Sequence, residues 1–262
     1  MAVIRNRAKD KLKAGELALG IGIRQARTVD IAKISKVCGY DWLFIDMEHN
    51  AMSMETAVEI SVAALDAGIT PVVRAAGHEH FHATRPLDGG AQGVVVPHVN
   101  SAAEAQRVVS NCRYPPIGHR SVAGGAPQLE YEALPVGEFT RVQNENTLVV
   151  VMLESPEAIG NAEEIAAVEG IDVLLIGTND LCAEMGIPGE FGHPDVERAY
   201  DRTIAACRAN GKFAGLGGIY DQDLARKFVR MGARFVLAGN DLSFLMAAAR
   251  GRSEFLRSIS PG

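Results

Sequence analysis

The sequence predicts an α/β protein built as a single (β/α)8 TIM barrel with parallel strands, one domain over residues 1–262. The length of 262 residues matches the ~250 residues usual for one such barrel. Hydrophobic residues make up 47% of the chain and aromatic residues only 6%, which suits parallel strands under packed helices. Eight short apolar runs recur along the chain, at 17–23 (LALGIGI), 42–46 (WLFID), 70–74 (TPVVR), 93–97 (GVVVP), 148–153 (LVVVML), 172–177 (DVLLIG), 213–218 (FAGLGG) and 235–240 (FVLAGN).

Segments with helical spacing separate these apolar runs. Several begin at Ser, Thr or Asp and end at Gly or Asn, which are common capping residues. Strict alternation favours parallel strands with right-handed crossovers, and eight such units favour closure into a barrel. The long Pro- and Gly-rich stretch at 113–127 is typical of functional loops, and we expect the loops around 113–147 and 186–194 to line a substrate pocket. The helical segments are 28–39, 53–68, 101–112, 195–210 and 221–232.

Composition and charge argue against several classes of partner. A formal net charge of -6 gives no basic field for nucleic acid. The four cysteines form no CxxC pair, which fits reduced thiols in the cytoplasm. Because no run of eighteen apolar residues occurs, we expect no membrane span and a cytoplasmic protein.

Polar residues gather directly after the apolar runs, where parallel barrels place their reactive groups. The residues at these positions are Asp46, Glu48 and His49 after the second run, Arg74 at the end of the third, Pro97 and His98 at the fourth, Glu154 after the fifth, Asp180 after the sixth, and Asn240 and Asp241 at the eighth.

Glu154 and Asp180 offer hard oxygen ligands from neighbouring strands. Without a Cys or His partner they suit Mg²⁺, Mn²⁺ or Co²⁺ with open water positions, and such a metal can chelate a 2-oxo acid. Alternatively, each carboxylate only caps the helix that follows its strand. The alternating histidines of GHEHFH (77–82) resemble a zinc site, but a helix-like stretch follows and would make them diverge. The Gly-rich segments 121–126 and 214–220 are explained equally well by a phosphate site or by tight turns.

Arg74 and His49 each allow two interpretations. A buried Arg74 needs a carboxylate, either of a substrate or of Asp46 or Glu48. His49 has the chemistry of a general base that neighbouring acids can orient, although a His after a strand is also a common helix cap.

Several motifs together identify a family. The segments DWLFIDMEHN, PVVR, VVVPHVNSAAEAQRVVSNCRYPPIGHRSVAGG, MLESPEAIGNAEEI and IDVLLIGTNDLCAEMGIPG resemble those of the HpcH/HpaI class II pyruvate aldolases. The resemblance runs in order from about residue 15 to residue 245. It implies a metal-dependent lyase that cleaves 4-hydroxy-2-oxo acids, as 4-hydroxy-2-oxoheptanedioate aldolases do in aromatic catabolism, and that assembles as a homohexamer.

The resemblance also implies roles for individual residues. Glu154 and Asp180 match the metal ligands, His49 the base for the C4 hydroxyl proton, and Arg74 the residue that stabilises the enolate oxygen. Asp88 matches an acid that strengthens this base, often from a neighbouring subunit, and Asp46 supports the same His. The turn from Gly177 through Thr178 and Asn179 to Asp180 matches the pyruvate carboxylate site, where backbone N–H groups bind the anion.

Two positions depart from the pattern of the family. Met152 stands where many relatives have a substrate-contacting Gln, and Thr178 stands where they commonly have Pro. The first puts the substrate's orientation in question, and the second the rigidity of the carboxylate-binding turn.

The sequence therefore predicts an aldolase that reversibly forms pyruvate and an aldehyde through a pyruvate enolate. Two alternatives remain open at this stage. One is another enolate reaction on the same site, such as a decarboxylation coupled to carbon–carbon bond formation or the cleavage of an aromatic-derived substrate. The other is a non-catalytic barrel that binds 2-oxo acids.

Overall fold

The computed structural model describes residues 3–260 and confirms the closed barrel. Eight parallel strands follow one another in sequence order, and β8 pairs with β1 to close the sheet. Each predicted strand is present, with limits that agree within one residue. The strands are β1 (Ala18–Ile23), β2 (Trp42–Asp46), β3 (Thr70–Arg74), β4 (Gly93–Val96), β5 (Leu148–Leu153), β6 (Val173–Gly177), β7 (Phe213–Gly217) and β8 (Phe235–Asn240).

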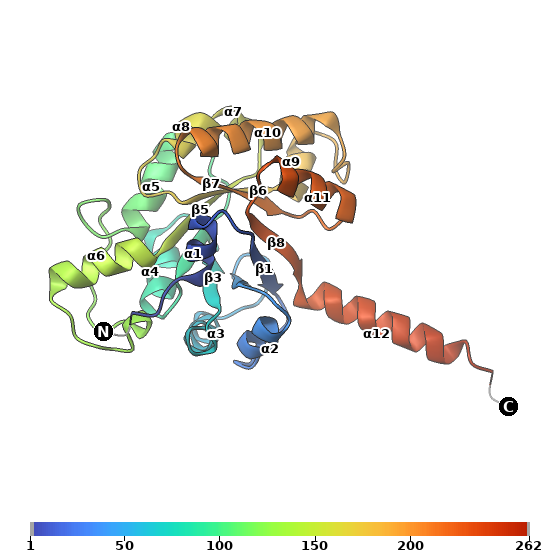
Figure 1. Ribbon diagram of the computed structural model, residues 1–262, viewed down its shortest axis with the longest axis horizontal. Coiled ribbons are helices and arrows are strands. Elements are labelled where there is room, and N and C mark those ends of the chain that lie inside the picture. The colour runs from blue at the N-terminus through green and yellow to red at the C-terminus, as the bar shows by residue number, and fades with distance from the viewer. Residues whose placement is uncertain (1–2, 261–262) are drawn as a thin grey trace.

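Helices surround the barrel (Figure 1). The five predicted helical segments correspond to α2, α3, α5, α10 and α11, and the remaining helices were not predicted as such. None of the helices within residues 3–260 has the length and apolar character needed to cross a membrane. The helices are α1 (Arg7–Lys13), α2 (Ile31–Val37), α3 (Met54–Ala67), α4 (His80–Asp88), α5 (Ala102–Cys112), the 3-10 turn η1 (Pro127–Leu129), α6 (Val136–Asn146), α7 (Pro156–Gly160), α8 (Ala162–Ala166), α9 (Thr178–Glu184), α10 (Pro194–Ala209), α11 (Gln222–Met231) and α12 (Asp241–Arg257).

The inside of the barrel is filled by large apolar side chains. Trp42 and Phe235 stack with ring centroids 3.9 Å apart. Gly20 makes this possible, because a Cβ at this position would lie 2.1 Å from the indole ring of Trp42. Ala8 and Leu12 of α1 pack into the same cluster, so α1 covers the amino ends of the strands and leaves only the carboxyl ends for a site.

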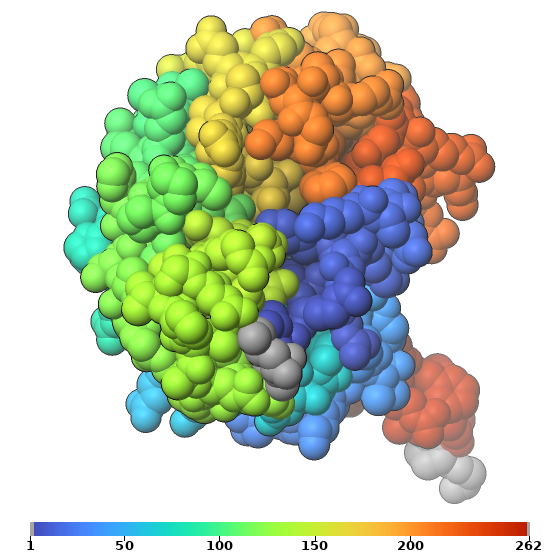
Figure 2. Space-filling model, turned by 60° about the vertical axis from the view of Figure 1, so that its left-hand side comes forward, coloured from blue at the N-terminus to red at the C-terminus, as the bar shows by residue number. Residues whose placement is uncertain are grey.

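Buried charges hold α1 on the barrel. Asp172 pairs with Lys9 at 2.9 Å and with Arg113, and Lys9 also donates to the carbonyl of Thr147. Figure 2 shows the blue N-terminal segment lying against the yellow-green segment that contains α6. These contacts join segments far apart in the sequence at the amino end of the barrel.

The long stretch at 113–127 does not contribute to the pocket of its own chain, contrary to our expectation. It follows the carboxyl end of α5 and therefore lies at the amino end of the barrel, opposite the strand ends that carry the site. Of the described residues that line the central cavity, none comes from 113–147 or from 186–194.

The last helix leaves the barrel. Figures 1 and 2 show α12 projecting away from the body of the protein. The structure describes all of α12, and none of its residues is buried. Its large apolar side chains are about half exposed, among them Leu245 at 63% and Phe255 at 57%.

Candidate active site

A cavity of about 240 Å³ opens among the carboxyl ends of strands β1 to β3 and β5 to β8. Its volume suits a small ligand rather than a drug-sized one. Most of the residues that the sequence pointed to lie in its wall, namely Asp46, His49, Arg74, Met152, Gly177, Thr178, Asn179 and Asp180. The fold thus brings together side chains from β2, β3, β5 and β6, as the rule for parallel barrels predicts.

Arg74 is paired with the protein's own acids in this ligand-free structure. Its Nε donates to Asp46 Oδ1 at 2.9 Å and its Nη2 to Asp46 Oδ2 at 2.7 Å, while Nη1 lies 2.9 Å from Glu48. Burial favours a high pKa for Asp46, but the hydrogen bonds and charge of Arg74 outweigh it and hold that pKa below its usual range. Two of the five guanidinium N–H groups thereby donate to Asp46 and Nη1 forms an ion pair with Glu48, which leaves at least two N–H groups for a ligand.

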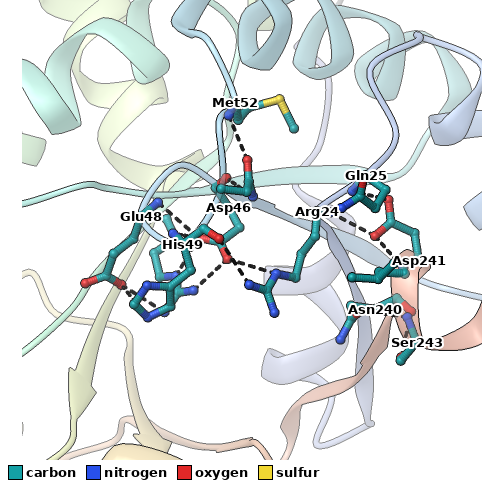
Figure 3. Close-up of polar contacts among 12 residues, drawn as sticks. Arg24, Gln25, Asp46, Glu48, His49, Met52, Asn240, Asp241 and Ser243 are labelled. Atoms are coloured by element: carbon teal, nitrogen blue, oxygen red, sulfur yellow. Dashed lines mark hydrogen bonds and ion pairs between the residues drawn. The ribbon is translucent and has the colours of Figure 1, made fainter. Parts of the chain in front are cut away.

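His49 lies on the loop after β2 with its side chain about half exposed (Figure 3). Asp46 accepts the backbone N–H of His49 at 3.2 Å, so it positions the main chain of this loop. The imidazole Nε2 lies 3.8 Å from a carboxylate oxygen of Glu48. In a single chain Glu48 is therefore an acid within reach of this ring, as expected of the neighbouring acids that can orient the base.

Glu154 is buried at 2% exposure. Burial raises its pKa to about 7; the backbone N–H of His98 and the imidazole of His98 oppose this effect, while the charges of Asp180 and Glu48 add to it. Gly177 makes room for this carboxylate, because a Cβ there would lie 2.5 Å from Glu154 Oε1. Asp180 is only half-buried, but a buried carboxylate with a second acid acting on it is costly unless a cation joins them.

These features fit a divalent metal held by Glu154 and Asp180. Within residues 3–260 no group of three or more His, Cys, Asp or Glu side chains is arranged to hold an ion. A metal here would accordingly take its remaining oxygens from water or substrate, which is the common arrangement for Mg²⁺. The donors are hard oxygens and agree with the choice of Mg²⁺, Mn²⁺ or Co²⁺.

The turn after β6 is held by Thr178, one of the two positions that depart from the pattern of the family. Thr178 is fully buried, and its hydroxyl lies 2.7 Å from the Tyr200 hydroxyl and 2.6 Å from the Gly217 carbonyl oxygen. Thr178 therefore fixes the start of α9 by hydrogen bonds instead of by the closed ring of a proline. Asn179 and Asp180 follow in the first turn of α9 and face the cavity.

Asp88 lies far from the rest of the site. It ends α4, and the carboxyl end of this helix lies at the amino end of the barrel, opposite the cavity. There it pairs with the buried Arg120 at 2.6 Å. Within one chain Asp88 cannot act on His49, so the role implied by the resemblance requires a second chain.

Four residues of the site region escaped the roles assigned from sequence. Arg24 and Tyr220 line the cavity, and His98 lies between Glu154 and Glu48, 3.3 Å from the first and 3.7 Å from the second. Asp241 binds the backbone of the loop after β1. The strand-end rule would have found Arg24, which directly follows the first apolar run.

Comparisons with known proteins identify the family of the chain and agree with its fold. The model of a family described as HpcH/HpaI aldolase/citrate lyase matches residues 25–248. A 4-hydroxy-4-methyl-2-oxoglutarate aldolase of Chaetomium globosum is 38% identical over 248 residues, covering 93% of this chain and 92% of its own. A 2-keto-3-deoxy-L-rhamnonate aldolase of Escherichia coli is 34% identical over 261 residues, covering 100% and 97%. The crystal structure of an HpcH/HpaI aldolase from Desulfitobacterium hafniense has a TM-score of 0.91 at 28% identity, covering 97% of both chains.

Proposed function

The chain belongs to the HpcH/HpaI aldolase/citrate lyase family, and from this premise we propose that it splits a 4-hydroxy-2-oxo acid reversibly into pyruvate and an aldehyde. Its relatives are aldolases, and this chain is an aldolase that cleaves a hydroxy-oxo acid. The observation that carries the fuller proposal is one small cavity lined by His49, Arg74 and Asp180. The buried Glu154 lies close enough to Asp180 for the charge of Asp180 to act on it.

The proposed cleavage breaks the C3–C4 bond of the substrate. His49 takes the proton of the C4 hydroxyl, the C4 oxygen becomes the carbonyl of the aldehyde, and the bonding electrons pass into the pyruvate enolate. The enolate then takes a proton at C3 and becomes pyruvate. Arg74 offers its remaining N–H groups to the developing enolate oxygen, an interaction that is stronger in the transition state than in the ground state.

The 2-oxo acid end of the substrate lies, in this proposal, against the turn after β6. Backbone N–H groups at Asn179 and Asp180 bind its carboxylate, and the hydrogen bonds of Thr178 keep the turn in place. When bound to Glu154 and Asp180, Mg²⁺, Mn²⁺ or Co²⁺ would supply Lewis acidity to the oxygens of this end. Met152 lines the same cavity without a hydrogen-bonding group, so substrate orientation depends on the turn and on Arg74.

We further propose a homo-oligomer, hexameric as the resemblance implies. The exposed apolar residues of α12 need a partner surface. On the barrel, α2 exposes Ile34 at 52% and Val37 at 88%, and α11 has one buried residue among those described. Around the barrel, β1 and β8 lie between α2 and α11. In an ordinary (β/α)8 barrel the last helix packs at this position, which α12 leaves open in this chain. A second copy's α12 fits this position, and a further contact between chains would bring Asp88 to His49. A cytoplasmic location is proposed from the unpaired cysteines and the lack of a long apolar run in the sequence. A role in aromatic catabolism is proposed from the family resemblance.

The test is pyruvate release from 4-hydroxy-2-oxo acids of several chain lengths, with Mg²⁺, Mn²⁺ or Co²⁺. Wild type is compared with His49→Ala and Glu154→Ala. Glu157→Ala, an exposed glutamate of α7 three positions after Glu154, is the control. We expect metal-dependent release from wild type and the control and its loss in the two site variants. Release of CO₂ without an aldehyde would favour the other enolate chemistry, and binding of pyruvate without turnover of any substrate would favour the binding protein.

A further inference from the structure

Arg24 is a cation at the cavity mouth with few partners in the protein. It follows β1, and its side chain is 39% exposed. Its Nη2 donates to the carbonyl of His49 at 3.1 Å. The nearest carboxylate oxygen, on Asp46, lies 3.9 Å from Nε and already accepts a hydrogen bond from Arg74. Within residues 3–260, the buried Nε of Arg24 finds no hydrogen-bond partner. The side chain therefore has donors available to a ligand.

The backbone that carries Arg24 is held firmly. Its N–H donates to Asp241 Oδ1 at 2.9 Å, and the next two N–H groups, of Gln25 and Ala26, donate to Asp241 Oδ2 at 2.9 and 2.7 Å. Figure 3 shows the Asp241 carboxylate among these donors, with the Arg24 side chain extending toward Asp46. Because Asp241 begins α12 at the seam between β1 and β8, the barrel fixes the position from which Arg24 reaches the cavity.

Arg24 lies across the mouth from the carboxylate pair. In the closed order of strands, β1 is four strands from β5, which leads to Glu154, and three from β6, which leads to Asp180. Arg24 and Asp180 line one continuous cavity. A substrate bound by its 2-oxo acid end at the β5–β6 side thus directs the substituents on C4 toward the β8–β1 side.

Two further hydrogen-bonding groups stand beside Arg24. Tyr220 and Asn240 line the same part of the cavity. Burial raises the pKa of the Tyr220 hydroxyl, against opposing effects of Asn240 and of the charges on Arg24 and Arg74, so this hydroxyl stays protonated at neutral pH and can donate. A guanidinium with a phenol and an amide beside it is a set of donors suited to a carboxylate.

We propose that Arg24 selects substrates whose departing aldehyde or ketone half carries a carboxylate, and that it binds this group directly. The inference rests on the proposed aldolase function and names its substrate class. The competing explanation is that Arg24 only steadies the His49 loop through the carbonyl of His49. The two explanations differ in which substrates lose kcat/KM when the charge of Arg24 is removed: only the carboxylated ones, or all of them.

The experiment measures kcat/KM for three 4-hydroxy-2-oxo acids with the preferred metal. One carries a carboxylate on C4, one carries it at the end of a two-carbon chain on C4, and one carries a neutral alkyl chain of matched length. Wild type is compared with Arg24→Gln and with Arg27→Gln. Arg27 is the matched control, because this exposed cation bonds to carbonyls of the same loop and lies outside the cavity lining.

We expect wild type to prefer a carboxylated substrate and Arg24→Gln to lower the ratio of carboxylated to neutral kcat/KM by about 10- to 100-fold, the usual effect of losing a hydrogen bond to a charged group. Whichever carboxylated substrate loses more kcat/KM in Arg24→Gln shows how far from C4 the carboxylate bound by Arg24 lies. Arg27→Gln should keep the wild-type ratio. An equal loss on all substrates in Arg24→Gln, or a wild type without preference, would overturn the inference while leaving the aldolase function intact. A wild type that releases pyruvate from none of them would overturn both.

Discussion

The guanidinium of Arg74 holds Asp46 through two parallel hydrogen bonds of 2.9 and 2.7 Å, and both side chains are buried. Such a bidentate pair fixes both the position and the plane of the guanidinium. Asp46 also accepts the backbone N–H groups of Glu48 and His49 at 3.0 and 3.2 Å. One carboxylate thus sets the position of the proposed enolate-binding cation and of the loop that carries the proposed base.

Arg74→Lys should lower kcat by about 10²-fold or more, because an ammonium group cannot bind Asp46 at two points and still present N–H groups to the enolate. The fold should survive, since one charge pair with Asp46 remains. Steady-state pyruvate release and thermal unfolding together test this. Activity close to that of wild type would show that the fork geometry of Arg74 has no part in the reaction.

Glu154→Gln should abolish metal binding without unfolding the protein. The amide keeps the shape of the side chain and an oxygen that can accept the His98 N–H, while it removes a buried charge next to Asp180. In wild type, a ligand at about 100 times its Kd stabilises the folded state by about 2.7 kcal/mol, so Mn²⁺ should raise Tm in wild type and not in Glu154→Gln. Glu157→Gln, on the exposed side of α7, should respond as wild type does. A metal-induced Tm rise of equal size in all three proteins would place the metal elsewhere.

Simple rules predicted the barrel from the sequence and named several of the residues that line its cavity. β-branched runs predicted every strand, and the strand-end rule predicted that Arg74, Glu154 and Asp180 would meet. The expectation that 113–127 lines the pocket was wrong for a single chain, because it ignored which end of the barrel the loop occupies. The role of Asp241 could not be predicted, since it binds the backbone of Arg24 across 217 positions of sequence. The outward course of α12 also depends on contacts that a single sequence does not reveal.

Thr178→Val should destabilise the protein by about 1–3 kcal/mol, because it leaves the buried Tyr200 hydroxyl and the Gly217 carbonyl without this partner. Adding Tyr200→Phe removes one of these groups, so the double variant should lose less than the sum of the two single losses. Urea unfolding of the four proteins measures the coupling. Strictly additive losses would show that the hydroxyl contact at 2.7 Å contributes nothing to stability.

Acid should lower the stability of the fold by protonating Asp172 at the amino end of the barrel. Burial favours a raised pKa for Asp172, but the charges of Arg113 and Lys9 prevail and lower it. A carboxyl whose folded pKa lies below its unfolded value of about 3.9 stabilises the fold above that pH, and this contribution is lost as the pH falls through the folded pKa. At pH 7, Asp172→Asn should cost about 3–5 kcal/mol, because two buried cations lose their partner.

The difference between wild type and Asp172→Asn should therefore shrink below about pH 4, as urea unfolding across a pH series can show. Asp223→Asn is the control, since its exposed pair with Arg226 contributes at most about 1 kcal/mol. A gap between wild type and Asp172→Asn that stays constant down to pH 2 would contradict this account.

The proposed homo-oligomer can be tested by substituting the exposed apolar residues of α12. Leu245→Glu with Phe255→Glu places charges on the apolar residues that a second chain should cover, while Ser253→Glu adds a charge at a polar position of the same helix. We expect sedimentation to show a smaller assembly for the double variant alone, because burying an unpaired carboxylate costs several kcal/mol. A wild type that sediments as a monomer would contradict the assembly proposed above.

Activity can then reveal whether chains share a site. If Asp88 of one chain supports His49 of another, Asp88→Asn and His49→Ala are each nearly inactive as pure proteins. Co-expressed, they form mixed assemblies in which an intact His49 can face an intact Asp88, so part of the activity should return. Unfolding of Asp88→Asn must be measured alongside, since the buried Arg120 loses its partner. Mixed assemblies as inactive as the parents, with both variants folded, would confine the site to one chain and leave Asp88 a structural role beside Arg120.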